Sequence, residues 1–63
     1  MTRTPSSIRA ALQANRTAQA RVQAAMKRLR RKGQDAGHLF AEWLEMKGRE
    51  DAMEDELDAA LAA

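Results

Sequence analysis

Two absences limit how this chain can be stabilised: it has no cysteine and no long apolar run. Without cysteine it can form neither a disulfide nor a thiolate metal site. No window approaches the roughly 18 apolar residues of a membrane span, and the first ten residues lack the apolar core of a signal peptide. We therefore expect a cytoplasmic protein with no membrane partner.

Large apolar residues are also scarce. Of the 28 hydrophobic residues among the 63, 14 are alanine, and the sequence has a single Phe and a single Trp. A chain this short buries only about 60% of the surface that its unfolded form exposes. We therefore expect one domain over residues 1–63, and a second copy or another partner to cover the remaining apolar surface.

Acidic residues are absent from the first 32 positions, which carry nine Lys or Arg. Residues 33–63 reverse this balance, with nine Asp or Glu against Lys47 and Arg49. The net charge of +2 therefore conceals a division into +9 and −7. Such an asymmetry favours a nucleic-acid partner, an acidic protein partner or self-pairing.

A heptad repeat predicts a first helix from about residue 5 to residue 32. Its members are Ile8, Asn15, Val22 and Leu29, with Ala11, Ala18 and Ala25 at the interleaved positions. Thr4 and Pro5 suit the start of a helix, because threonine accepts a capping hydrogen bond and proline is tolerated in the first turn. Gly33 suits a left-handed end.

A second helix is predicted from about residue 36 to residue 61, after a turn at 33–36 capped by Asp35. Gly48 interrupts it and indicates either a bend or a division into two shorter helices. Two helices of similar length joined by a short turn form an antiparallel hairpin. The predicted fold class is therefore all-α.

One hairpin leaves an apolar edge uncovered, so we expect two copies to form an antiparallel homodimer with a four-helix core. The residues expected in this core are Ile8, Leu12, Val22, Met26, Leu29, Leu39, Phe40, Trp43, Met46, Met53 and Leu57. Asn15 either fixes the register from a buried position or faces water near an open end.

Hairpin geometry predicts that the two charged regions stay apart. With the turn near Asp35, Arg30 lies opposite Phe40 and Arg16 opposite Glu54, some 14 residues further along. At about 1.5 Å per residue the separation is about 21 Å, well beyond a screening length of about 8 Å. The basic end therefore needs either the acidic tail of a second copy or another anionic partner.

The leading hypothesis is a small non-enzymatic regulatory or accessory protein that binds the backbone of DNA or RNA. The predicted contact residues are Arg16, Arg21, Lys27, Arg28, Arg30, Arg31 and Lys32, which can neutralise phosphates. No aromatic residue is assigned to base stacking, because Phe40 and Trp43 are assigned to the core. In outline the architecture is similar to that of small plasmid or phage regulators of the RNA-binding hairpin type.

Two alternatives remain open. One is a protein-binding module, antitoxin-like or a phage- or plasmid-encoded inhibitor, whose acidic second helix covers a basic site on its partner. The residues assigned to that contact are Glu50, Asp51, Glu54, Asp55 and Asp58. The other is a purely structural oligomerising hairpin.

Other classes find no support in the sequence. A helix-turn-helix reader would place Glu42 and Glu45 against phosphates, which repel carboxylates. His38 is the only histidine, so we expect no metal site and no cofactor. The carboxylates of the second helix are expected on a solvated face without a base or nucleophile, so no enzymatic activity is expected.

Overall fold

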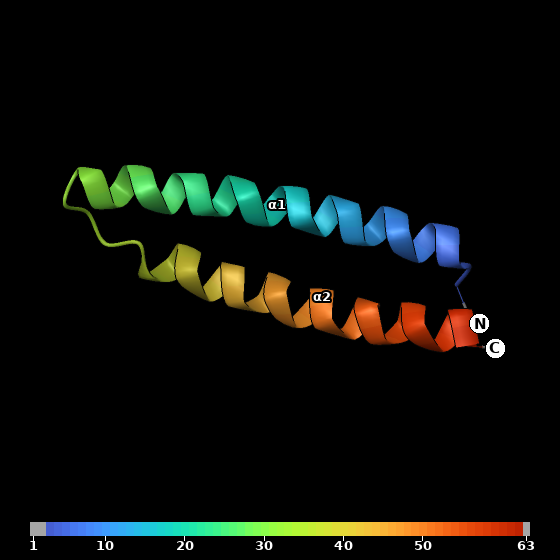
Figure 1. Ribbon diagram of the computed structural model, residues 1–63. Helices are drawn as coiled ribbons and strands as arrows, with labels where there is room; N and C mark the ends of the chain where they lie inside the picture. Colours follow the sequence, from blue (N-terminus) through green and yellow to red (C-terminus); the bar gives the residue numbers. More distant parts are fainter. Residues whose placement is uncertain (1–2, 63) are drawn as a thin grey trace.

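The computed structural model describes residues 3–62, and all regular structure in that part of the chain is helical. Helix α1 spans Pro5–Arg31 and helix α2 spans Gly37–Ala62. The two run antiparallel and side by side, with the turn at one end and both chain ends at the other (Figure 1). The all-α hairpin predicted from the sequence is confirmed. The molecule is a rod of 49 × 16 × 15 Å.

Local chemistry explains where α1 begins and ends. The Thr4 hydroxyl accepts a hydrogen bond from the Ser7 amide at 3.2 Å, and Pro5 occupies the first turn. At the other end Gly33 has a φ of +71°, a conformation that costs an L-residue free energy. This lets the Gln34 amide donate to the Leu29 carbonyl at 2.9 Å, which satisfies a carbonyl left over by the helix.

Helix α2 has a different N-terminal cap and then runs without interruption. The Asp35 carboxylate accepts a hydrogen bond from the Gly37 amide at 2.9 Å, so Asp35 caps the second helix as expected. Helical structure continues through Gly48, which neither splits α2 nor divides it into two elements. A Cβ atom at Gly48 would meet nothing within 4 Å, so no close packing requires a glycine there.

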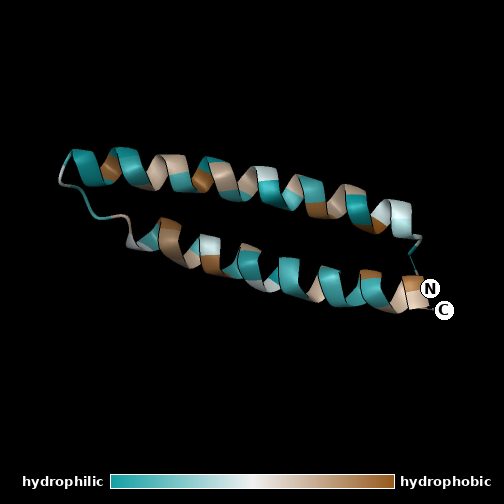
Figure 2. Cartoon of the chain, in the orientation of Figure 1, coloured by the Kyte–Doolittle hydropathy of each residue, from teal (hydrophilic) through white to brown (hydrophobic). Residues whose placement is uncertain are grey.

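The core is the single seam between the helices. On both helices the inward positions alternate in steps of four and three residues, as in a coiled coil. On α1 they are Ile8, Leu12, Asn15, Gln19, Val22, Met26 and Leu29; on α2 they are Leu39, Trp43, Met46, Glu50, Met53, Leu57 and Ala60. Figure 2 shows the most hydrophobic residues of α2 near its two ends, with a hydrophilic stretch between them.

Burial along the seam is uneven. Ile8 is fully buried, Leu12 and Met26 nearly so, and the other expected core residues are half-buried, with one exception. Phe40 is 46% exposed in the single hairpin, and its place in a four-helix core stays a prediction. A two-helix hairpin has only one seam, and Phe40 follows the inward Leu39 by one residue, which turns it about 100° away.

Neither helix contains a stretch that is both long enough and apolar enough to cross a membrane, as far as residues 3–62 are concerned.

Candidate functional site

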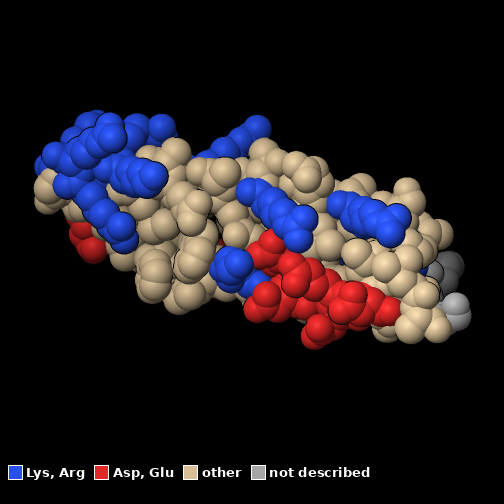
Figure 3. Space-filling view, in the orientation of Figure 1, with Lys and Arg blue, Asp and Glu red and all other residues tan. Residues whose placement is uncertain are grey.

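Five cations gather at the turn end of the hairpin, and we call them the loop-end cluster: Lys27, Arg28, Arg30, Arg31 and Lys32. All five are exposed. They stand in the last turn and a half of α1 and at its cap, where the unpaired carbonyls of the helix favour positive charge. Figure 3 shows a continuous blue region at the turn end, with a small red patch beside it and the large red region further along α2.

Within the described residues 3–62, no member of the loop-end cluster forms an ion pair. The cations that do have carboxylate partners are Arg3, Arg16 and Lys47, all of which lie elsewhere on the hairpin. The positive charge at the turn is therefore not neutralised within the described chain, as the hairpin geometry predicts.

Arg16 and Arg21, also assigned to the nucleic-acid surface, have different surroundings. Arg16 donates from Nε to Glu50 Oε2 at 2.8 Å and from Nη2 to Glu54 Oε1 at 3.2 Å. The contact with Glu54 confirms the pairing predicted from the hairpin geometry. Arg21 is exposed and lies six residues, or about 9 Å, before Lys27 along α1. Arg21 can therefore extend the loop-end cluster, whereas Arg16 is held by carboxylates.

A central polar layer interrupts the apolar seam, and it consists of Asn15, Gln19 and Glu50 with Arg16 and Lys47 at its edge. Glu50 is only 7% exposed. Its carboxylate accepts hydrogen bonds from Arg16 Nε at 2.8 Å, Lys47 Nζ at 2.9 Å and Gln19 Nε2 at 3.2 Å. Gln19 Nε2 also donates to Asn15 Oδ1 at 2.6 Å. Asn15 is half-buried in this layer and does not stand at an open end of the hairpin.

The hydrogen bonds in this layer keep Glu50 ionised. Arg16 contributes most, followed by Lys47 and Gln19, and together they lower the pKa of Glu50 from 4.5 to about 2 against the opposing effect of burial. The expectation that every α2 carboxylate lies on a solvated face is therefore wrong for Glu50. Gln19 and Glu50 were missed as a pair, although both occupy positions in the alternation of four and three residues that defines the seam.

Five further acidic residues lie between 51 and 58 on α2, where Figure 3 shows its large red region. Asp51, Asp55 and Asp58 are exposed and make no ion pair in the described part of the chain. Glu54 is half-exposed and is shared with Arg16. Glu56 is paired with Arg3 at 2.7 Å, which lowers its pKa. We call Asp51, Glu54, Asp55 and Asp58 the acidic patch.

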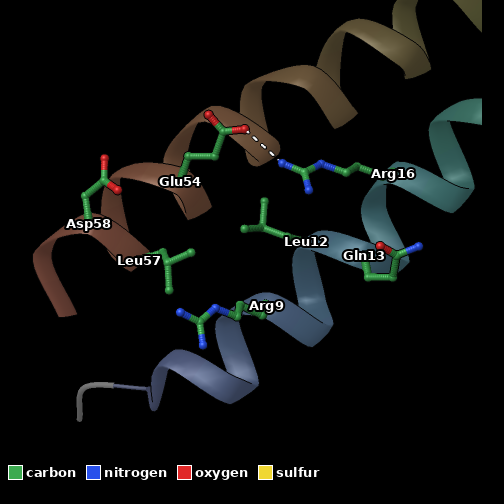
Figure 4. A pocket seen from close by; sticks show the side chains of 7 residues that line it. All are labelled: Arg9, Leu12, Gln13, Arg16, Glu54, Leu57 and Asp58. Carbon is green, nitrogen blue, oxygen red and sulfur yellow. Dashed lines mark hydrogen bonds and ion pairs between the residues drawn. The ribbon is translucent and has the colours of Figure 1, made fainter. Parts of the chain in front are cut away.

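A groove open to solvent runs between the helices near the chain ends (Figure 4). Leu12 and Leu57 form its floor, Arg9 and Arg16 project from α1, and Glu54 and Asp58 project from α2. Charges of opposite sign therefore face each other across it. Its lining contains no Ser, Thr, Lys or His side chain.

A second hollow lies at the turn, beside the loop-end cluster. Arg30, Phe40 and the turn residues 34–37 line it. This agrees with the predicted position of Arg30 opposite Phe40. The Phe40 ring stacks on Trp43, with ring centroids 6.0 Å apart and an interplanar angle of 22°.

Among residues 3–62, no three His, Cys, Asp or Glu side chains are grouped so that they could hold a metal ion. Comparison with family models, with curated proteins and with solved structures gives no match to the chain.

Proposed function

We propose that this chain is a non-enzymatic regulatory or accessory protein that binds the phosphate backbone of nucleic acid through the loop-end cluster and Arg21. One observation carries the proposal: five exposed cations stand within six positions, and none has a carboxylate partner in residues 3–62. Lys and Arg side chains that neutralise phosphates release the counterions condensed on nucleic acid, which favours binding.

The helical spacing divides these cations between two faces of α1. Arg30 and Arg31 lie three and four residues after Lys27, so these three cations share one side of α1. Arg28 and Lys32 lie seven and eleven residues after Arg21, so these three share another side of α1. Each side therefore offers three cations to one phosphate backbone, and a single duplex contacts about three at a time.

Salt dependence tests the proposal. Three phosphate contacts give a slope of about −2.7 for the logarithm of the affinity against that of the salt concentration. Between 50 and 200 mM salt we therefore expect the affinity for a short DNA duplex to fall about 40-fold in an electrophoretic mobility assay. If micromolar protein shifts neither DNA nor RNA at 50 mM salt, the proposal is refuted.

A matched pair of variants separates the loop-end cluster from net charge. Arg28→Gln with Arg31→Gln removes two charges from the cluster, whereas Arg9→Gln with Arg49→Gln removes two exposed charges elsewhere. The first double variant is expected to bind at least about tenfold more weakly than the second, since it removes phosphate contacts from both faces. Equal losses would mean that overall charge, and not this cluster, drives binding.

The acidic patch favours a second candidate, self-association into an antiparallel homodimer with a four-helix core. Its exposed carboxylates suit a basic surface, and a second copy of the chain offers one in its loop-end cluster. The pairing would also cover Phe40, Leu44 and Leu61, which are 46%, 50% and 55% exposed. It would occupy the cations assigned to phosphates, so dimer and nucleic-acid complex would compete.

Sedimentation equilibrium tests this second candidate. We expect a dimer at 50 mM salt and a shift towards monomer at 500 mM salt, because complementary exposed charges are screened. Asp51→Asn with Asp55→Asn should have the same effect at low salt. A monomer at about 100 μM protein and 50 mM salt would refute the homodimer and leave the nucleic-acid proposal intact.

A further inference from the structure

Phe40 is an aromatic residue that stands outside the seam between the helices. It is 46% exposed at the turn end of the hairpin, next to the loop-end cluster. It lines the hollow at the turn together with Arg30, Gln34, Asp35, Ala36 and Gly37. An aromatic ring and an unpaired guanidinium therefore border the same open space.

The Phe40 ring is supported from within the hairpin. It stacks on Trp43, with 6.0 Å between ring centroids, and Trp43 is itself a half-buried member of the seam. Offset stacking of two rings is a favourable geometry. The ring is thus backed by a second ring while nearly half of its surface remains open to solvent.

We propose that Phe40 is a stacking platform for one unpaired base, with the adjoining phosphates held by Arg30 and its neighbours Lys27 and Arg31. The site would then prefer single-stranded nucleic acid to a duplex. This inference rests on the backbone-binding function proposed above and specifies its ligand. Proteins that bind single strands combine a cationic surface with an aromatic ring on which a base stacks.

The polar lining of the hollow fits a base better than it fits an apolar protein surface. Arg30 lines it together with Asp35, whose carboxylate accepts the Gly37 amide hydrogen at 2.9 Å. Asp35 repels phosphate and Arg30 attracts it, so the phosphates are expected against Arg30 and away from Asp35. Gln34 and Asp35 can then hydrogen-bond the edge of a base, whereas an apolar surface would bury the charges of Arg30 and Asp35 without water.

A base in a duplex cannot reach Phe40, because it is paired and stacked inside the helix and its extrusion costs free energy. Duplex DNA would therefore engage the loop-end cluster alone. A single strand would engage the cluster and the ring together. Duplex and single strand have the same phosphate backbone, so a difference in their affinities measures the contribution of stacking separately from that of charge.

The test compares three fluorescently labelled ten-nucleotide ligands by anisotropy at 50 mM salt: oligo-dT, a DNA duplex, and an abasic strand with the same number of phosphates. We expect oligo-dT to bind about tenfold more tightly than the abasic strand, the scale of one base–aromatic stack. Phe40→Leu should abolish that ratio and leave duplex binding unchanged. Phe40→Tyr, which keeps a ring, should preserve the ratio.

Leu44→Ala is the matched control, because Leu44 is 50% exposed one turn further along α2 and does not line the hollow. It should leave the ratio unchanged. Trp43 provides a second readout, since it is the only tryptophan and lies against Phe40. Its fluorescence should change with oligo-dT and not with the abasic strand.

Three results would overturn the inference, and they differ from one another. Absence of binding by all three ligands would refute the backbone-binding function as well. If the three bind equally and Phe40→Leu changes nothing, while Arg28→Gln with Arg31→Gln weakens all of them, the function stands and stacking is refuted. If Phe40→Leu leaves the ligand ratio intact and converts a dimer to a monomer, Phe40 is a contact between two copies.

Discussion

Arg16 and Glu50 are 34 residues apart in the sequence and 2.8 Å apart across the hairpin. The Arg16 guanidinium also reaches Glu54, so a single side chain of α1 holds two carboxylates of α2. Glu50 lies in the seam, and its charge is neutralised by Arg16 and Lys47. The register of the two helices is therefore coupled to an ionic contact near the middle of the hairpin.

The first prediction concerns acid. The pKa of Glu50 is about 2 in the folded chain against an ordinary value of 4.5. The ionised carboxylate therefore adds stability that is complete above about pH 4.5 and is lost as the pH falls towards 2. Melting temperatures measured by circular dichroism should fall more steeply over this range for the wild type than for Glu50→Gln. The curves should meet near pH 2, and parallel curves would contradict the assignment.

Arg16 itself gives the second prediction. Arg16→Gln removes the largest contribution to the lowered pKa of Glu50 and leaves a buried carboxylate with Lys47 and Gln19 alone. We expect a lower melting temperature at pH 7 and an acid transition at higher pH. Arg9→Gln is the control, because Arg9 makes no ion pair in the part of the chain described. Equal melting temperatures for the two variants would show that the contact adds nothing.

The third prediction separates stability from specificity in the central polar layer. Replacing buried ionic groups by apolar residues of similar size is often neutral or stabilising. Gln19→Leu with Glu50→Leu is therefore expected to melt at or above the wild-type temperature, yet to lose the contact that fixes the helix register. Amide NMR spectra should show more than one set of signals. A single set would mean that the apolar seam alone defines the register.

The fourth prediction concerns two glycines, at which substitution by alanine should change the stability of the hairpin in opposite directions. Gly48 is helical and exposed, and nothing lies within 4 Å of an added Cβ, so Gly48→Ala should stabilise the hairpin by about 1 kcal/mol. Gly33 has a φ of +71°, so Gly33→Ala should destabilise it by about 1 to 2 kcal/mol. Urea unfolding measures both. A loss of stability in Gly48→Ala would show that α2 needs flexibility there.

The parts of the fold set by local chemistry could be predicted from the sequence. Thr4, Gly33 and Asp35 act within a few residues of themselves, so their roles follow from neighbouring positions alone. The separation of the charged regions was predictable for a related reason. Once the turn is located, an antiparallel hairpin fixes which residues lie opposite one another, and the contact between Arg16 and Glu54 agrees with this.

Residues whose burial depends on the partner helix could not be predicted from residue type. Glu50 stands among four other acidic residues between 50 and 56, and an acidic run indicates a solvated face. Only its place between Met46 and Met53 in the seam pattern points inwards. Phe40 is exposed in the single hairpin because the one seam has room only for Leu39 and Trp43 on that turn, and its burial in a four-helix core stays a prediction.

The hairpin is 49 Å long and carries the loop-end cluster at one tip and its acidic patch towards the other. Such a molecule has a large electric dipole moment along its axis and turns its positive tip towards any polyanion before contact. Neighbouring copies attached to one strand by that tip would all project their carboxylates outwards. The strand would then be coated by a layer of negative charge, in which lateral repulsion limits how closely further copies can crowd.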